Sequence, residues 1–417
     1  MTLPLRSAED LATRQVEPFS EEVLEAIRPI IDDVKRRGEE ALRRYTVQFN
    51  ERKADDPLYL DQAALRRGLE ALPDAAGARL ERTAGRIETF ARAQREAIAP
   101  VTVSVPGGSA GHFVEPVQRA GCYAPGGRYP LPSSALMTAV TARVAGVESV
   151  WVASPRLTPI TIAAAAVAGA DGLLVAGGAH AIAALAFGVG PVPPSDIVVG
   201  PGNKYVTAAK QLLSRLVAID TVAGPSELVV VGDAGTNPGL AAADLLAQAE
   251  HDPDALPVLV TADSSLVGRV EAALDAQLGN LPTADVARVA LNRGGAVVCS
   301  SRDEVIDACN RIAPEHLQLS VTDPDAFLPG LEHYGAVFLG EGAGEVLGDY
   351  GAGPNHVLPT GRAARYSGGL SVFNFLRIRT WMSSGPGEPR GEFLEDVAWM
   401  ARQEGLEAHA RAAEARR

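Results

Sequence analysis

The sequence has little cysteine, an excess of acidic over basic residues, and no long uninterrupted apolar run. Only three cysteines occur among 417 residues, Cys122, Cys299 and Cys309, and none forms a CxxC pair. This number and spacing exclude a disulfide scaffold and a cysteine-rich zinc site, so we expect a reducing cytoplasm. Lys and Arg number 38 against 51 Asp and Glu, a formal charge of −13. That balance gives no electrostatic footprint for nucleic acid or an anionic membrane, and neither is expected as a partner.

The apolar segments are too short or too broken to predict a membrane span. The longest uncharged run, 172–194, contains five glycines and three prolines, and predicts a buried strand, a turn and a buried helix. Glu9 and Asp10 lie where a signal peptide would have its apolar stretch, so export is not expected. Apolar residues make up 47% and charged residues 21%, which is typical of a folded globular protein of two or three domains.

Helical and strand patterns follow one another along the chain. Residues 20–49 and 61–97 have apolar residues three and four apart, which predicts long amphipathic helices. After Pro100, short β-branched runs alternate with Ala-rich segments of helical length, which predicts an α/β fold with two Rossmann-like parallel-sheet units. The predicted strands are 149–152, 173–175, 197–199, 228–231, 258–260 and 297–298. The predicted helices among them are 136–145, 158–168, 180–187, 204–216 and 240–251.

These patterns also predict how the chain divides into domains. The expected parts are an N-terminal arm (1–19), a larger α/β domain (20–122 and 227–366), an inserted α/β domain (123–226) and a C-terminal tail (367–417). The tail contains a predicted helix from 392 to about 415, which follows the Gly/Pro-rich segment 383–387. A helix detached in this way is suited to packing on a neighbouring subunit.

Three short segments group side chains that could form a catalytic site. Gln248 and His251, three apart at a predicted helix end, could bind one metal ion through an amide oxygen and an imidazole nitrogen. Glu315 and His316 could supply two proton-handling groups if a loop lets them converge. Asp349 lies in GDYGAGPNH, whose glycines allow the backbone to lie close to a ligand. Taken singly, each segment is also compatible with an ordinary polar helix end or surface loop.

Four further segments carry weaker signals. GPGN at 200–203 follows a predicted strand and opens a helix, where an α/β sheet offers backbone N–H groups to a phosphate. YAPGG at 123–127 and AGPSE at 223–227 are turns with polar edges. Glu404 and His409 share a helix face only if the helix ends between them, which the intervening glycine permits. Taken alone, turns of this kind more often connect secondary-structure elements than bind a ligand. A charged segment like the one with Glu404 and His409 is more often a solvent-exposed helix.

Eight motifs in a fixed order resemble one known family. They are GCYAPGGRYPLPSSALM, GGAHAIAALAFG, GPGNKYV, DTVAGPSEL, LLAQAEHD, APEHL, GDYGAGPNHVLPT and EGLEAH. Together they resemble the histidinol dehydrogenase family over about residues 20–411. The resemblance implies a homodimer with one zinc ion per subunit, which oxidises L-histidinol to L-histidine through L-histidinal with two NAD, at the end of histidine biosynthesis. It also implies that the helical tail is swapped between subunits, so that EGLxAH reaches the neighbouring protomer's site.

The same resemblance implies that the larger α/β domain holds the metal and catalytic residues and that the inserted α/β domain binds the nucleotide. It also implies roles for individual residues. The catalytic acid/base residues would be Glu315 and His316. The metal ligands would be Gln248, His251, Asp349 and His409. The substrate would be bound by Ser226, Gln248, His251, His316, Asp349, Glu404 and His409. Tyr123 and Asn203 would contact NAD, and His180 stands at the third such position, where the family usually has the glutamine of GGAQAIA.

Other functions stay open beside this one. The mixed nitrogen and oxygen ligands fit a catalytic zinc site and also suit manganese or cobalt. A related metal-dependent NAD dehydrogenase could act on another amino or vicinal alcohol, since loops outside the motifs can reshape a pocket. A zinc hydrolase could use the same residues on water, but the GPGN and YAPGG turns count against it. A non-catalytic oligomeric α/β protein is a further alternative, but such a protein would not need a complete set of metal ligands and catalytic bases.

Overall fold

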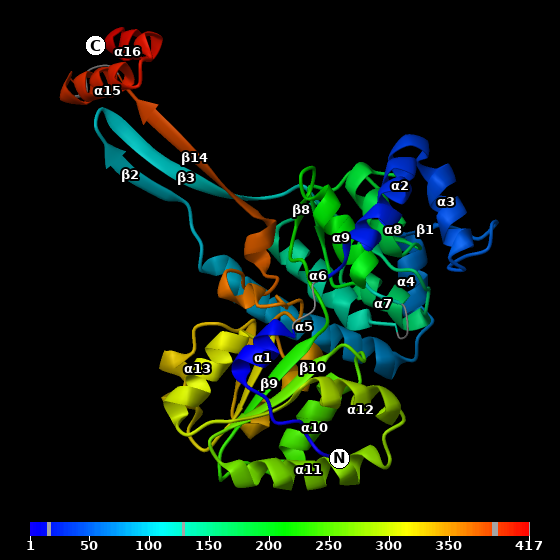
Figure 1. Ribbon diagram of the computed structural model, residues 1–417. Coiled ribbons are helices and arrows are strands. Elements are labelled where there is room, and N and C mark those ends of the chain that lie inside the picture. The colour runs from blue at the N-terminus through cyan, green and yellow to red at the C-terminus, as the bar shows by residue number, and fades with distance from the viewer. Residues whose placement is uncertain (15–17, 127–129, 386–390, 417) are drawn as a thin grey trace. The chain divides into compact units, whose positions relative to one another are not determined.

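The computed structural model describes residues 1–14, 18–126, 130–385 and 391–416, which form two compact units (Figure 1). The first unit comprises Met1–Gln94 and Val117–Phe375, and the second comprises Arg95–Pro116 and Leu376–Arg417. Gly127 of the YAPGG turn, and Pro386 and Gly387 of the predicted break before the tail helix, lie outside the described residues. No described helix is long and apolar enough to cross a membrane.

The first unit contains a six-stranded sheet that is parallel apart from one edge strand. Its strands are β1 (Tyr59–Asp61), β4 (Arg119–Tyr123), β5 (Ser149–Ala153), β6 (Gly172–Leu174), β7 (Ile197–Val199) and β8 (Ala218–Ile219). They lie in the order β1-β6-β5-β4-β7-β8, and only β1 is antiparallel to its neighbour. Strands β6 and β7 are buried along their whole length, as apolar runs in a sheet covered on both faces should be.

Helices from two distant parts of the chain belong to this sheet. They are α2 (Glu21–Arg37), α3 (Glu39–Gln48), α4 (Gln62–Glu70), α6 (Pro132–Ala145), α7 (Pro159–Val167), α8 (Gly178–Phe187) and α9 (Lys204–Leu213). Helix α2 packs on α8 and α9, and Ile27 shares one apolar core with Leu185 and Val206. The expected boundaries instead grouped residues 20–122 with 227–366. Periodicity shows which face of a helix is apolar, but it does not show which sheet that face covers.

A second, fully parallel sheet of five strands lies in the same unit. The strands are β9 (Glu227–Gly232), β10 (Leu256–Thr261), β11 (Gly295–Val298), β12 (His316–Ser320) and β13 (Ala336–Leu339). The associated helices are α1 (Ala8–Thr13), α5 (Asp74–Glu96), α10 (Pro238–Ala249), α11 (Ser264–Leu278), α12 (Ala284–Arg293), α13 (Arg302–Ile312) and α14 (Glu345–Asp349). The N-terminal arm packs here, because Leu3 and Leu11 are buried in the apolar cores of this sheet and Leu5 forms a parallel bridge with Ala296.

The two sheets share one strand order. Counted along the chain, β6-β5-β4-β7-β8 and β11-β10-β9-β12-β13 both run third, second, first, fourth, fifth. This is the Rossmann-like order, whose direction switches between the first and fourth strands. The prediction of an α/β fold with two parallel-sheet units is therefore confirmed. Ligands in such sheets usually bind at the carboxyl ends of the strands beside the switch point.

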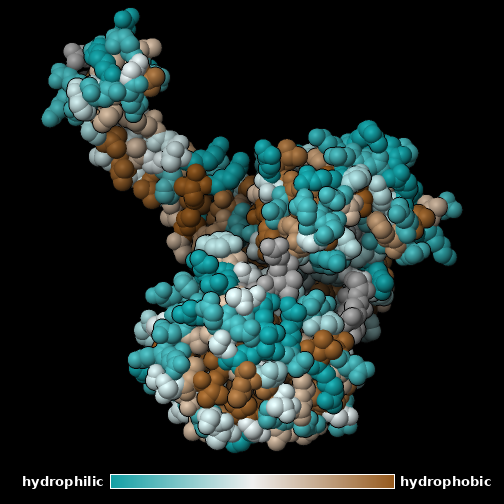
Figure 2. Space-filling view, viewed as in Figure 1, coloured by the Kyte–Doolittle hydropathy of each residue, from teal (hydrophilic) through white to brown (hydrophobic). Residues whose placement is uncertain are grey.

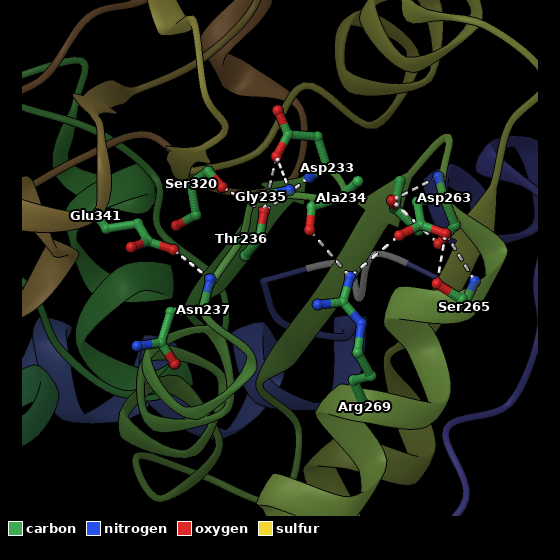
Figure 3. A network of polar contacts seen from close by, with 11 residues as sticks. Asp233, Ala234, Gly235, Thr236, Asn237, Asp263, Ser265, Arg269, Ser320 and Glu341 are labelled. Carbon is green, nitrogen blue, oxygen red and sulfur yellow. Dashed lines mark hydrogen bonds and ion pairs between the residues drawn. The ribbon is translucent and has the colours of Figure 1, made fainter.

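In the second sheet this position is filled by the protein's own polar groups (Figure 3). Asp233 follows β9 and accepts a hydrogen bond from the backbone N–H of Thr322, which follows β12 (2.8 Å). The hydroxyl of Thr236 donates to the carbonyl oxygen of Ser320. These hydrogen bonds join the ends of β9 and β12.

The second unit is a three-stranded antiparallel sheet followed by two helices. Its elements are β2 (Val101–Val105), β3 (Gly108–Pro116), β14 (Leu376–Ser384), α15 (Gly391–Gln403) and α16 (Glu407–Glu414). The predicted tail helix is therefore two helices, which separate at Gly405, where φ is +77°. The sheet was not predicted, because β14 pairs with β3 and these strands are about 260 residues apart in sequence. No local pattern reports such a pairing.

Candidate active site

Two buried acidic residues and a histidine meet at the amino ends of β9 and β12. Because these strands are parallel neighbours, Glu315 and His316 lie beside Glu227. The Glu315 carboxylate accepts a hydrogen bond from the Glu227 N–H (3.0 Å), and His316 Nδ1–H donates to the Glu227 carbonyl oxygen (3.1 Å). One backbone unit thus holds both side chains, and Glu315 Oε2 lies 3.6 Å from His316 Nδ1. The expected convergence of this pair is observed.

The charges around this pair shift its proton affinities. Burial raises the pKa of Glu315 to about 7, against the opposing effects of His316 and of hydrogen bonds that include one from the Ser226 hydroxyl. Burial alone would lower the pKa of His316, but the carboxylates of Glu315, Glu345 and Asp349 outweigh it and raise the value to about 10. The surroundings of His316 are therefore rich in negative charge, which favours a bound cation.

One possible metal site is formed by His251, Glu345 and Asp349. Each offers a ligand atom, and these atoms lie within 4.8 Å of one another. Glu345 and Asp349 are four apart on α14 and so lie on one face, while His251 follows the end of α10, which contacts α14. Glu345 was not among the predicted residues. Its position four residues before Asp349 was the available signal.

Gln248, another predicted metal ligand, has an unusual environment. It is fully buried in the last turn of α10, yet neither its Oε1 nor its Nε2 has a hydrogen-bond partner among the described residues. Glu345 Oε2 is buried without a partner as well. Buried polar atoms rarely stay unpaired, because desolvation without a hydrogen bond is costly. The unpaired oxygens, with His251 and Asp349, fit a divalent ion that takes nitrogen and oxygen ligands.

Asp349 connects the metal candidates to the catalytic pair. Its Oδ1 lies 3.5 Å from His316 Nε2. Burial opposes ionisation of Asp349, but His316, His356 and His251 outweigh it and lower its pKa. His356 Nδ1–H donates to the Asp349 carbonyl oxygen (2.9 Å), and Ser134 lies 3.4 Å from His356 Nε2. Sequence analysis assigned no role to His356 or Ser134, whose contact joins segments 222 residues apart.

The glycines beside Asp349 have a structural purpose that differs from the expected one. Gly351 and Gly353 have φ values of +93° and +143°, which favour glycine. A Cβ at these positions would meet Thr83 and Phe90 of α5, and Arg86 donates to the Gly351 carbonyl oxygen (2.6 Å). The glycines therefore let the loop pack against α5, whereas the sequence suggested that they let the backbone approach a ligand.

The carboxyl ends of β4 and β7 in the first sheet lie at a cavity. This cavity of about 1180 Å³ lies at the switch point beside β4 and β7 and is lined by all three predicted nucleotide residues, Tyr123, His180 and Asn203. It is also lined by the metal candidate His251. A single space within the first unit thus contacts both groups of residues, and its size is sufficient for a large cofactor.

The GPGN turn is held rigidly at the edge of this cavity. Gly200 has φ of +118°, and a Cβ there would lie 2.1 Å from the Tyr123 carbonyl oxygen, so only glycine fits. Lys210 donates to the Gly200 carbonyl oxygen (2.9 Å), while Asp220 accepts from its N–H (2.7 Å). Asn203 caps α9 through its side-chain oxygen, which leaves its amide nitrogen available to a ligand. The predicted strand, turn and helix are confirmed here.

The last two predicted residues belong to the second unit. Glu404 lies between α15 and α16, His409 lies in the first half of α16, and both are exposed. They therefore belong to a different unit from the other predicted site residues.

Comparisons with known proteins agree on one family. The family model described as histidinol dehydrogenase matches residues 13–417. A histidinol dehydrogenase of Thermus thermophilus is 46% identical over 400 residues, 96% of each chain, and one of Pseudomonas putida is 42% identical over 93% of this chain and 89% of its own. The crystal structure of histidinol dehydrogenase from Elizabethkingia anophelis matches with a TM-score of 0.92 at 31% identity, over 100% of this chain and 96% of that one.

Proposed function

The chain belongs to the histidinol dehydrogenase family, and we propose that it oxidises L-histidinol to L-histidine through L-histidinal, with two NAD and one zinc ion per subunit. Membership makes it an NAD-dependent oxidoreductase of histidine biosynthesis. The observation that carries the detailed proposal is the link from the buried pair Glu315–His316, through Asp349, to His251 at the cavity that Tyr123 and Asn203 also line.

We propose that zinc is held by Gln248, His251, Asp349 and His409, the last from a neighbouring subunit. When bound, zinc would orient the amine and imidazole of the substrate and offset the carboxylate charge around His316. Ser226, at the start of β9, and Glu404 would contact the same substrate. Manganese and cobalt suit this ligand set too.

The proton chemistry follows from the hydrogen bonds of the catalytic pair. His316 Nδ1–H is engaged by the Glu227 carbonyl, so Nε2 is the nitrogen that takes the alcohol proton as the hydride leaves for NAD. Glu315 then takes a proton from the water that adds to the aldehyde, and His316 returns its proton to the aldehyde oxygen, so that the diol forms and Nε2 is free again. Glu315 releases its proton to solvent. The resulting diol loses a proton to His316 and a second hydride to a second NAD, which leaves the carboxylic acid. NAD supplies only the hydride acceptor in this scheme.

The second unit supports the proposed homodimer with shared active sites. In its sheet, the strand register places Val101, Val103, Ile378 and Met382 on one face, and each is 42–58% exposed. Figure 2 shows apolar side chains along these strands. The helices α15 and α16 pack on each other through a small alanine cluster. An apolar face of this kind needs a cover, and we propose a second copy of the chain.

The three cysteines fit the cytoplasm, which we propose as the location. All three are buried and unbonded. Burial raises the pKa of the Cys122 thiol to about 12, so this thiol stays protonated and unreactive.

Turnover with L-histidinol tests the proposed function directly. Zinc-loaded protein should form two NADH for each L-histidinol consumed and one for each L-histidinal, measured by absorbance with amino-acid analysis of the product. Another amino or vicinal alcohol that gives a higher kcat/KM would favour the related dehydrogenase. A hydrolase would form no NADH from L-histidinol, so the absence of NADH formation would refute the proposal.

Glu345 allows a test of the metal site by a residue outside the four proposed ligands. Glu345→Gln removes a buried carboxylate charge from the cluster, and we expect metal affinity to fall about 10- to 100-fold. The measurement is zinc competition against a chromogenic chelator. Glu341→Gln is the matched control, because Glu341 bonds the Asn237 N–H and lies outside the cluster. Equal affinity in both variants would contradict a role of Glu345 at the metal.

A further inference from the structure

The cavity contains a buried acid and histidine pair that the reaction scheme does not use. His180 Nε2–H donates to Glu51 Oε2 (2.9 Å), and the Gly177 N–H donates to the same oxygen (3.0 Å). The side chains of His180 and Glu51 are 1% and 13% exposed, and both residues line the cavity. The pair joins the end of α3 to the start of α8, residues 129 apart in sequence.

Several contacts hold this carboxylate in one place. Asn50, two residues after the end of α3, has φ of +57°, and the Glu51 N–H donates to the Thr46 carbonyl oxygen (2.8 Å), which fixes the backbone. The ring of His180 stacks on that of Phe49, with centroids 5.5 Å apart. A Cβ on Gly177 would lie 2.6 Å from Glu51 Oε1, so the glycine is what lets the carboxylate approach.

One oxygen of this carboxylate remains available to a ligand. Both hydrogen bonds to Glu51 use Oε2, and no described residue donates a hydrogen bond to Oε1. A fixed carboxylate with a free oxygen accepts hydrogen bonds from hydroxyl groups, and it repels phosphate. In a dinucleotide the hydroxyl groups belong to the riboses. The nicotinamide end has to face His251 and the substrate, which leaves the adenosine ribose for the part of the cavity at Glu51.

We propose that Glu51 is a specificity-determining residue, which accepts a hydrogen bond from the adenosine ribose of NAD and rejects the 2′-phosphate of NADP, and that His180 is its positioning residue. This inference rests on the proposed use of a dinucleotide by the enzyme. It gives His180 a role that differs from the direct NAD contact implied at this position by the family's glutamine. The chemistry matches that of Rossmann sheets, where a carboxylate binds the ribose of NAD.

Dinucleotide affinities of the full-length, zinc-loaded protein test this inference. Isothermal titration with NAD and with NADP should show a strong preference for NAD in the wild type. Glu51→Gln keeps the shape but removes the charge, so the preference should fall by at least about tenfold. His180→Leu should lower it too, while His180→Gln, which still offers an N–H donor, should restore it. In turnover with NAD, His180→Leu should raise KM and leave kcat nearly unchanged.

Glu148→Gln is the matched control, because Glu148 is an exposed carboxylate outside the cavity lining. It should leave the NAD preference unchanged. An unaltered preference in Glu51→Gln, or a wild type that binds both dinucleotides equally or neither, overturns the inference. Since affinity is measured without L-histidinol, a wild type that prefers NAD but does not oxidise L-histidinol would refute the proposed function alone.

Discussion

Replacing His316 with alanine is expected to slow both oxidation steps by about 10²- to 10⁴-fold, the usual contribution of a positioned acid/base group. His316 is the buried imidazole whose Nδ1 is engaged by a backbone carbonyl and whose Nε2 lies 3.5 Å from Asp349. Both steps release a proton from a hydroxyl group, of the alcohol first and of the diol second. The rate of each step should therefore fall, and the decrease in kcat should be far larger than the change in KM.

Glu315→Gln is expected to separate the two steps. Its carboxylate is proposed to activate water on the aldehyde, so the variant should oxidise L-histidinal more slowly, relative to wild type, than it oxidises L-histidinol to the aldehyde. Single-turnover formation of NADH from each substrate measures the two rates separately. The amide retains an oxygen that can accept the Glu227 N–H, so the local backbone should keep its structure.

His333→Ala is the control for loss of an imidazole, because His333 belongs to no cluster in the described structure and has no proposed role. It should leave both rates near those of the wild type. Zinc content and the midpoint of thermal unfolding should be measured for every variant, because a misfolded site would slow all steps alike. Equal defects of Glu315→Gln at both steps would contradict the division of roles between the two residues.

Mixing two inactive variants is expected to restore activity if the active site is shared between subunits. His409→Ala removes a proposed ligand in the second unit, and His251→Ala removes one in the first. In a mixed dimer, one site carries both lesions and the other carries neither. Random exchange makes half of the dimers mixed, so activity should return to about one quarter of the wild-type value if the sites act independently.

The same mixture also reveals the opposite architecture. If each site were built within one chain, every site would keep one lesion and no activity would return. Each variant mixed with itself serves as the control for exchange conditions. Size-exclusion chromatography with light scattering should show dimers for both variants, and monomers would contradict the proposed second copy on the apolar sheet face.

The sequence by itself determined the local structure and indicated the pairs of site residues that are close in sequence. Buried β-branched runs such as 197–199 and 228–231 identified strands, because a strand covered on both faces needs apolar side chains throughout. The adjacency of Glu315 and His316 and the three-residue spacing of Gln248 and His251 permitted each pair to converge but did not decide it. Such patterns can be recognised in the sequence because they depend only on residues within one turn or one strand.

Only the tertiary structure decided which distant segments meet. It placed α2 on α8 and α9, paired β14 with β3, added Glu345 to the metal candidates, and joined Glu51 to His180. It also placed a cavity at the switch point of the first sheet and a hydrogen-bonded group of polar residues at that of the second. The physical reason is that such contacts depend on the packing free energy of the whole chain, which no local periodicity records.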